Sequence, residues 1–317
     1  MKKLTGIFIT VVLLVSVFSG FGLAQTYITF GTGSPGGTYY PLGGAMADLW
    51  TRLLDDIDAT AESTAASVEN CRLAGSNEVQ IGMAMGDVAF KAYHGQVQFE
   101  DNKQPILGLF SMYPAPQHFI SIDPDIKSIR DLEGKKVSVD APGSGCETMA
   151  RLIIEAAGLS YDDMRVSYYS QPEAAQAMKD RNIDALFWNF SYPGSAVQEV
   201  TAVRDVYFVP IDDDIIEKLT DEYGYYKSGV IPAGTYKGQE KDVATVQVGN
   251  DVVINAEIDE ETAYLLTKTL FENAEELHNV HPSAKQLVPE NGVKTAIPLH
   301  PGAAKYFTEV GLGDSCQ

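Results

Sequence analysis

The sequence is poor in cysteine: its 317 residues include only Cys71, Cys146 and Cys316. So sparse and odd a set is no disulfide framework. One bridge with one free thiol stays open, and the sequence does not select the pair. The five histidines lack the spacing of a zinc site; His278 and His281 stand three apart on an expected helix, but no cysteine lies near them. We therefore expect no metal and no other cofactor.

Basic residues are also scarce. Lys and Arg number 23 against 43 Asp and Glu, which gives a formal net charge of −20. This acidity argues against binding of nucleic-acid phosphates or anionic lipid heads. It does not exclude a small anion held by local dipoles. Neither a G-x-S-x-G elbow nor a P-loop is present, and no internal repeat or low-complexity linker is found.

Only one long apolar run occurs, at residues 4–18. Lys2 and Lys3 precede it, and the small residues Gly22 and Ala24 stand where a signal peptidase reads the chain. The pattern predicts a signal peptide at residues 1–24. An uncleaved membrane anchor is the alternative, although the run is short for a span. We therefore expect a soluble, periplasmic and monomeric mature protein.

The remaining chain alternates strand-like and helix-like segments, which is typical of α/β layers with parallel sheets. Expected strands lie at residues 27–30, 79–85, 106–112, 136–139 and 185–188. Apolar residues at helical spacing predict three helices, which are marked by Leu42, Met46, Leu49, Trp50 and Leu53, by Met149, Leu152, Ile153 and Ala156, and by Ala263, Leu266, Leu270 and Leu277. The third helix should begin near Asp259.

Two segments are expected to cross between domains. Two prolines interrupt an extended stretch at residues 113–116, and a second long extended stretch covers 244–254. A chain that leaves one domain once and returns once builds two lobes with a double hinge and a cleft. We therefore predict an α/β fold with two lobes, each a mainly parallel sheet flanked by helices. Lobe I should comprise 25–114 plus 248–317, and lobe II 115–247.

Three loops rich in glycine or serine, at residues 31–40, 63–70 and 141–146, each lead into an expected helix. The first turn of a helix has free N–H groups and a positive dipole end, which together attract anions. We predict that the three loops converge on the cleft and hold a small anionic solute. Ordinary helix capping by Ser67 or Ser144 is the alternative for a single loop.

The candidate ligand-binding residues follow from these loops. Lobe I should contribute Thr38, Tyr39, Tyr40, Ser67 and Asn70, with Asp87 as a weaker candidate that could instead cap a helix. Lobe II should contribute Ser144, Gly145 and Cys146, with Trp188 or Tyr192 covering the solute. Aromatic side chains can wall such a cleft, although core packing is the alternative for Phe187 and Trp188.

Two enzymatic interpretations stay open. Gly31, Gly33 and Gly36 form a G-x-G-x-x-G pattern, and Asp55 or Asp56 lies near the distance of a ribose-binding acid. A secreted protein has little access to NAD, which counts against a dinucleotide site.

The second interpretation is a thiol hydrolase. Cys146 stands at a helix start, where a thiolate is favoured, so it is a candidate nucleophile. It would need a histidine base, such as His118 or His300, brought near by folding. A small buried side chain beside the cleft is the alternative role. No catalytic residue is expected.

Six motifs in order along the chain resemble the TAXI-type solute receptors of TRAP transporters. They are GGTYYPLGG at 36–44, SVEN at 67–70 with Arg72 after it, APGSG at 141–145, IDA at 183–185, IPAGTY at 231–236 and IPLHPGA at 297–303. The resemblance implies a type II periplasmic-binding-protein fold. It also implies capture of a small organic acid, such as glutamate, 2-oxoglutarate or a dicarboxylate, for a permease driven by an ion gradient.

The chain departs from the family pattern at two places. Cys146 stands where the family usually has threonine, so a hydroxyl that could bind the ligand is missing. Ala65 and Ala66 stand where the family usually has glycine before the SVEN motif, which narrows the local backbone options. Both changes bear on the identity of the solute.

Overall fold

The computed structural model describes residues 25–316, so the expected signal peptide lies outside the described residues. Ten strands form one mixed sheet in the order β2-β1-β3-β10-β4-β7-β5-β6, with β8 beside β4 and β9 beside β10. The strands are β1 Thr26–Gly31, β2 Ile57–Glu62, β3 Ile81–Met85, β4 Ile106–Ser121, β5 Lys136–Ser138, β6 Arg165–Ser167, β7 Ala185–Asn189, β8 Tyr207–Phe208, β9 Tyr226–Ile231 and β10 Val243–Asn255.

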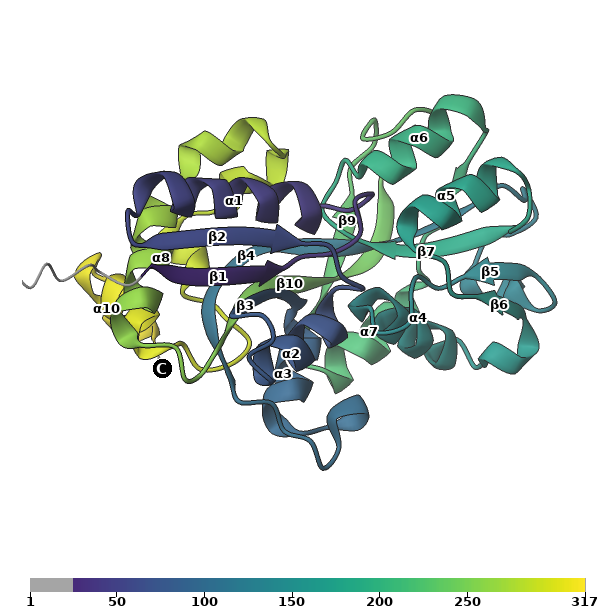
Figure 1. Ribbon diagram of the computed structural model, residues 1–317. Coiled ribbons are helices and arrows are strands. Elements are labelled where there is room, and N and C mark those ends of the chain that lie inside the picture. Colours follow the sequence, from purple (N-terminus) through teal and green to yellow (C-terminus); the bar gives the residue numbers. More distant parts are fainter. Residues whose placement is uncertain (1–24, 317) are drawn as a thin grey trace, which may run out of the picture.

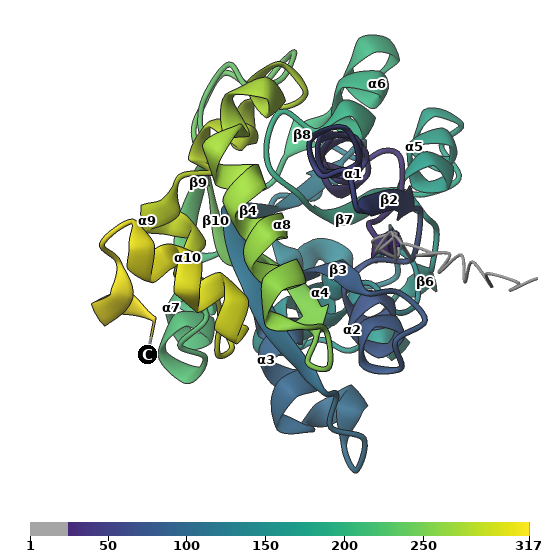
Figure 2. The ribbon, with the colours of Figure 1, turned by 60° about the vertical axis from the view of Figure 1, so that its left-hand side comes forward.

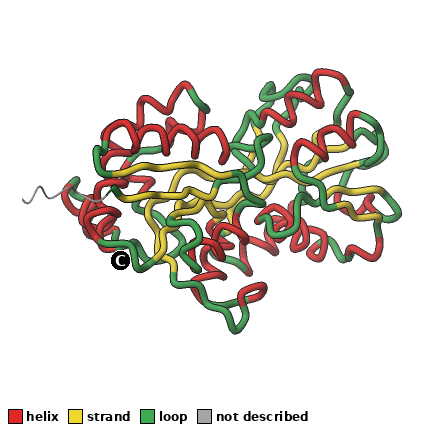
Figure 3. The backbone as a smooth tube through the Cα atoms, in the orientation of Figure 1, coloured by secondary structure: helices red, strands yellow, loops and turns green. Residues whose placement is uncertain are grey.

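Helices flank this sheet on both faces (Figure 1; Figure 3). The α-helices are α1 Tyr39–Leu53, α2 Ser67–Gly75, α3 Gly86–His94, α4 Gly145–Ala156, α5 Gln171–Lys179, α6 Ser195–Val203, α7 Asp213–Glu222, α8 Glu260–Glu272, α9 Pro289–Gly292 and α10 Pro301–Glu309. Short 3-10 turns are η1 Val97–Phe99, η2 Ile129–Leu132, η3 Tyr161–Asp163, η4 Ala274–Asn279, η5 Pro282–Gln286 and η6 Gly313–Ser315. Within residues 25–316, none of the helices combines the length and apolar character that crossing a bilayer requires.

The sheet has two parallel blocks joined by antiparallel strands. β1 pairs in parallel with β2 and β3, and β5 pairs in parallel with β6 and β7. Between the blocks, β10 runs antiparallel to β3, β4 and β9, and β4 runs antiparallel to β7 and β8. The predicted α/β fold with two parallel sheets is thus confirmed, with β4 and β10 inserted between them as long antiparallel strands.

β4 and β10 exchange partners along their length. β4 pairs with β10 up to Pro116 and with β7 from Gln117 onward. β10 pairs with β9 up to Val248 and with β3 from Asn250 onward, so Gly249 lies at the exchange point. Both strands therefore connect the two parallel blocks (Figure 1).

The expected interruption at residues 113–116 is wrong, because β4 continues through both prolines. Pro114 and Pro116 lie opposite Gly249 and Gln247 of β10, before β7 begins to pair on the other edge of β4. Proline lacks an N–H group and is tolerated in a strand where no neighbour needs that donor. The prolines therefore mark the partner exchange and not the end of a strand.

The first parallel block packs with α1, α8 and α10, and Figure 2 shows α8 and α10 side by side. Its apolar core includes Phe30, Trp50 and Phe271, while Trp188 belongs to a separate core beside the second block. The expected third helix begins as predicted, with Asp259 as its cap, but it ends at Glu272. Leu277 is instead in the 3-10 turn η4.

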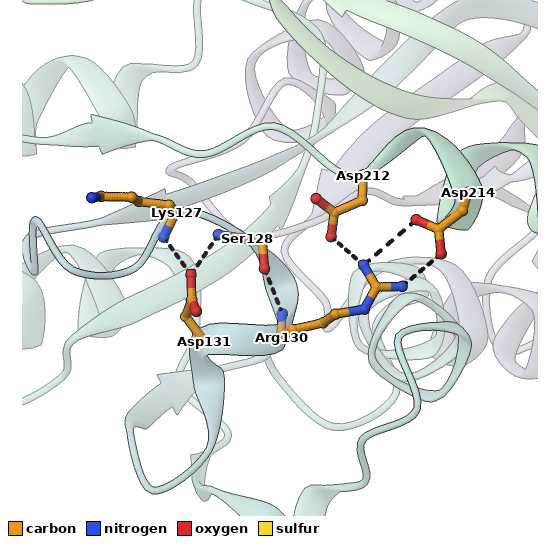
Figure 4. Close-up of polar contacts among 6 residues, drawn as sticks. All are labelled: Lys127, Ser128, Arg130, Asp131, Asp212 and Asp214. Carbon is orange, nitrogen blue, oxygen red and sulfur yellow. Dashed lines mark hydrogen bonds and ion pairs between the residues drawn. The ribbon is translucent and has the colours of Figure 1, made fainter.

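An exposed cluster links the start of α7 to the turn η2 (Figure 4). The Arg130 guanidinium donates to Asp212 at 2.7 Å and to Asp214 at 2.6 Å. Beside it, an Asp131 carboxylate oxygen accepts the N–H groups of Lys127 and Ser128, each at 2.9 Å. Because Arg130 and Asp214 are largely exposed, we expect this cluster to orient α7 more than to stabilise the fold.

Candidate functional site

The three predicted loops meet around one small cavity of about 40 Å³. The cavity lies where β1, β3, β5 and β7 end, which is the position at which open α/β sheets bind ligands. Its lining residues are Gly33, Ser34, Gly37, Thr38, Tyr39, Ala66, Ser67, Met85, Asp140, Ser144, Gly145, Cys146, Gln171, Asn189 and Phe190. Six of these are sequence-predicted site residues: Thr38, Tyr39, Ser67, Ser144, Gly145 and Cys146.

Contacts between the two parallel blocks close the cavity. The Gly143 carbonyl accepts the N–H groups of Val68 at 3.1 Å and Glu69 at 3.3 Å. The Ser195 hydroxyl donates to Gly36 O at 3.1 Å, and the Thr38 hydroxyl donates to Ser191 O at 3.3 Å. Because these hydrogen bonds join loops of the two parallel blocks that are far apart in sequence, the two blocks are closed around the cavity in this structure.

Gly145 makes the closest approach across this closure. A Cβ atom at this position would lie 2.5 Å from Met85 Sδ and 2.7 Å from Ser67 Oγ. Real Cβ atoms essentially never come that near a neighbour, so only glycine fits the closed arrangement without a shift. Gly145 is the first residue of α4, and its position brings the α4 N-terminus directly against α2.

Helices α1, α2, α4 and α5 all begin at the cavity, and their first residues line it. Thr38 precedes α1, and Ser144 caps α4 by accepting the Glu147 N–H at 3.0 Å. The capping role considered for Ser144 is therefore confirmed. In α2, the N–H groups of Val68 and Glu69 are already used by Gly143, so this helix offers the cavity mainly the Ser67 side chain.

The capping role considered for Ser67 is wrong. Ala66 occupies the cap position, and Ser67 is the first residue of α2. The Ser67 Oγ accepts the Met85 N–H at 3.1 Å, and the Ser67 hydroxyl contacts the Tyr39 hydroxyl in the cavity wall. Ser67 thereby ties α2 to the end of β3 while it lines the site.

Ala66 itself is in a conformation that favours glycine, with φ 71° and ψ −137°. A residue with a Cβ atom in this region is strained by about 1–3 kcal/mol. Ala66→Gly should therefore raise the free energy of unfolding by about 1 kcal/mol in urea denaturation. Ala65→Gly is the matched control, because Ala65 lacks the positive φ and should give no gain. An equal effect of both substitutions would contradict the strain at Ala66.

Of the aromatic candidates, Tyr39 lines the cavity and its hydroxyl donates to the Asn250 side chain. Burial raises the pKa of Tyr39 well above its usual value. Tyr40, the next residue, is 43% exposed and lies outside the cavity lining. Trp188 is fully buried in the core of the second block, as the alternative of core packing required. Tyr192 packs partly against the same core and lies outside the lining.

Asn70 and Asp87 lie behind the cavity and not in its wall. The Asn70 amide donates to Thr32 O and Met83 O, both at 2.7 Å, so it fastens the first loop to β3. Asp87 is buried in α3, where it pairs with Lys91 at 3.0 Å and accepts the Tyr226 hydroxyl at 2.8 Å. These partners give both residues structural roles in the closed arrangement.

Sequence reasoning missed Asp140, Gln171 and Asn189, which line the cavity from the second block. Asp140 is 5% exposed and accepts the Ala141 N–H at 2.7 Å. Burial raises the pKa of Asp140 to about 6, while hydrogen bonding by the Ala141 N–H and the Gln171 amide opposes the rise. Asp140 comes directly after a strand, at the edge where such sheets bind ligands, so its position in the sequence could have identified it as a candidate site residue.

Cys146 has the surroundings of a buried thiol and not of an activated nucleophile. Its sulfur lies 3.5 Å from both Gln117 Nε2 and Phe187 O, and burial raises its pKa. The two histidines considered as bases are engaged elsewhere. His118 contacts Pro116 O and Tyr236 OH, and His300 contacts Ile258 O.

The glycine-rich first loop leaves little room for a dinucleotide. Gly36 O accepts Ser195 Oγ, and a Cβ at Gly37 would lie 2.6 Å from Gln171 Oε1. A pyrophosphate needs the close approach that these side chains occupy. In residues 25–316, all three cysteines are free, and no cluster of three or more His, Cys, Asp or Glu residues has the arrangement of a metal site.

A larger open groove of about 1160 Å³ lies on the other side of the α4 N-terminus. Its lining includes side chains of both charge signs, among them Lys91, Arg151, Glu155 and Glu222. The Arg151 guanidinium pairs with Glu147 at its edge, at 2.5 Å. Of these two, the smaller cavity lies at the ends of four strands and is lined by all three predicted loops, so we take that cavity as the candidate site.

The mixed sheet, with the cavity at the ends of its strands, has the architecture of a periplasmic-binding-protein fold. The binding protein of an ABC phosphonate transporter from Pseudomonas aeruginosa is 12% identical, with a TM-score of 0.50 over 83% of this chain and 80% of that chain. A structure from Bordetella bronchiseptica RB50 is 15% identical, with a TM-score of 0.53 over 92% and 83%.

The periplasmic aliphatic sulphonate binding protein of Escherichia coli also matches, at 13% identity, with a TM-score of 0.46 over 92% of this chain and 86% of that chain. In sequence, the chain matches the NMT1-like family over residues 30–311. This protein therefore belongs to the NMT1-like family.

Proposed function

We propose that this protein is an extracytoplasmic, non-enzymatic receptor that captures a small anionic solute and delivers it to a membrane transporter. The observation that carries the proposal is the closed cavity at the ends of β1, β3, β5 and β7, faced by the α1 and α4 N-termini. The solute-binding proteins that share the fold support it. The buried thiol of Cys146 and the occupied glycine-rich loop favour this function over the two enzymatic ones.

The transporter proposed is of the TRAP type, with TAXI-type receptors as the relatives and an ion gradient as the driving force. The six motifs support this choice, and three of them, at 36–44, 67–70 and 141–145, contribute residues to the cavity wall. The Pseudomonas aeruginosa neighbour serves an ABC transporter, so the fold alone does not distinguish the two types. The proposed solutes are small organic acids or acidic amino acids, such as glutamate, 2-oxoglutarate or a dicarboxylate.

The receptor is proposed to open and close about a double hinge. Lobe I would comprise 25–114 plus 248–317, and lobe II 115–247. The partner exchanges at Gln117 of β4 and Gly249 of β10 lie within two residues of these bounds, which supports the division. Gly249 is paired with Pro114, three residues before Gln117, so the two strands change partners near each other and can bend together, as hinge closure requires.

The proposed location is the periplasm. The signal peptide expected at residues 1–24 supports it, together with the fold of the neighbours. Proteomic detection of a mature N-terminus at Gln25 in a periplasmic fraction would test the cleavage. An uncleaved chain in the membrane fraction would contradict it.

A thermal-shift screen of organic acids and amino acids tests the function. A solute in about hundredfold excess over its dissociation constant should stabilise the protein by about 2–3 kcal/mol, because it binds only the folded state. NAD should give no shift, since the glycine-rich loop is covered. Stabilisation by NAD, with no response to any acid, would contradict the receptor proposal.

A further inference from the structure

The cavity wall contains one acidic side chain, Asp140, in addition to the helix N-termini. Asp140 is buried there, and Tyr39 and Cys146 are the other titratable side chains in the lining. No lysine or arginine belongs to the lining, so Asp140 has no cationic partner in the wall. Burying a carboxylate without a cationic partner costs free energy of folding, so another group must stabilise the charge.

Two unpaired amide oxygens lie in the same wall. Gln171 is 7% exposed, and its Oε1 has no hydrogen-bond partner among residues 25–316. Asn189 Oδ1 is likewise buried without a partner, while its Nδ2 donates to Ala115 O at 3.2 Å. Leaving a buried acceptor unpaired costs about 1–3 kcal/mol each. The wall therefore presents two unpaired amide oxygens, from Gln171 and Asn189, beside the Asp140 carboxylate, whose neutral donors leave its charge without a counter-ion.

A primary ammonium group has the chemistry that these acceptors require, with three N–H donors and a positive charge. We propose, on the basis of the receptor function above, that the cavity binds a compact α-amino acid as its zwitterion. The α-ammonium group would donate to Asp140, Gln171 and Asn189. The carboxylate would accept from the α4 N-terminus and from the Ser67 hydroxyl. This inference narrows the solute class from organic acids in general to amino acids.

The same wall disfavours the other acids. A 2-oxoacid or a dicarboxylate would bring an oxygen acceptor toward Asp140 and leave the Gln171 and Asn189 amide oxygens unpaired. Unpaired and like-charged groups of this kind are the means by which binding sites reject near analogues. The small volume of about 40 Å³ adds a limit on size, since a single water needs about 10–15 Å³.

Asp140→Asn is the decisive variant. Asp140 has a φ of 75°, a conformation that asparagine tolerates well, and the new amide oxygen can still accept the Ala141 N–H. The variant therefore removes the charge and keeps the shape. Asp125→Asn is the matched control, because Asp125 is exposed and the change in net charge is the same.

Calorimetric titrations should compare each standard α-amino acid with its des-amino counterpart, such as glutamate with glutarate or alanine with propionate. The native protein should bind one amino acid about 30-fold or more tightly than its counterpart. Asp140→Asn should lose about 30-fold or more for that amino acid and change by less than about threefold for the counterpart. Asp125→Asn should behave as the native protein.

Each failure has a distinct meaning. Equal affinity of the native protein for both members of every pair would overturn the zwitterion inference and leave the receptor function standing. Unchanged amino-acid affinity in Asp140→Asn would overturn it as well. Binding of neither member of any pair would overturn the receptor function itself.

The pH dependence supplies a second readout. Protonation of Asp140 removes the charge that pairs with an ammonium group, and burial raises the pKa of Asp140 in the solute-free protein to about 6. Affinity for the amino acid should therefore be constant above about pH 7 and fall about tenfold by pH 5. The raised pKa values of Tyr39 and Cys146 keep both side chains neutral over this range. The profile of Asp140→Asn should be flat, and a slope identical to that of the native protein would count against the assignment.

Discussion

Gly145→Ala should lower solute affinity by about 10- to 100-fold while leaving the solute-free protein folded. In the closed arrangement the new Cβ would meet Met85 Sδ at 2.5 Å and Ser67 Oγ at 2.7 Å. Ser67 cannot retreat freely, because its Oγ accepts the Met85 N–H. Overpacking of this kind costs about 1–3 kcal/mol, and 1.4 kcal/mol corresponds to tenfold in affinity. The proposed hinge opens the contact in the free protein, and alanine also favours the helix that it begins.

Gly44→Ala is the matched control for this prediction. Gly44 lies in α1, and a Cβ there would meet nothing within 4 Å. Its affinity for solute should equal that of the native protein by isothermal titration calorimetry. Native affinity in Gly145→Ala would show that binding does not require the closed contact between α4 and α2.

Asp140→Asn should stabilise the solute-free protein at pH 7.5 by about 2–3 kcal/mol. The folded-state pKa of Asp140 is about 6 against an ordinary value of 3.8, because burial penalises the charged form. A raised acid pKa adds stability below about pH 4 and loses it as the pH rises through about 6. At 1.36 kcal/mol per pKa unit, removal of the charge should recover this loss.

Urea denaturation of both proteins at pH 7.5 and pH 4 measures the effect. The advantage of Asp140→Asn should fall below about 1 kcal/mol at pH 4, where the native carboxyl is also protonated. Asp251, whose pKa burial also raises to about 6, is present in both proteins, so its contribution cancels. A destabilised Asp140→Asn at pH 7.5 would mean that the hydrogen bonds from the Ala141 N–H and the Gln171 amide to the carboxylate outweigh the cost of burying its charge. A site residue whose removal stabilises the fold is typical of a group kept for binding.

The sequence predicted the order of the elements and the three loops well. Local patterns suffice for this: the periodicity of Leu42 to Leu53 marks α1, and the apolar run at 185–188 marks β7. The same patterns placed the helix starts at the loops, which lie at the ends of strands in the structure. The family resemblance extended this to the fold class, now confirmed by the mixed sheet.

Side-chain direction was harder to predict. Neighbouring residues on a helix point about 100° apart, so Tyr39 faces the cavity while Tyr40 is exposed. Neighbours on a strand point to opposite faces, so Trp188 is in the core while Asn189 lines the cavity. Which of two adjacent candidates faces a site depends on long-range register, and that was not available from the sequence.

The three acceptor residues of the cavity wall were not predicted for a similar reason. Asp140, Gln171 and Asn189 are separated by up to 49 positions and come together only through the pairing of β5 with β7 and the packing of α5. Each would pass alone as a loop, cap or strand-end residue. Their significance appears only in combination, as acceptors around one enclosed space.

A crystal structure of the protein with the tightest-binding amino acid from the titrations is the most direct test of the zwitterion site. We expect the amino acid in the small cavity, with its carboxylate at the α4 N-terminus and its ammonium group within hydrogen-bond distance of Asp140. Occupation of the open groove beside Arg151 and Glu222 instead, or a solute whose ammonium group points away from Asp140, would contradict it.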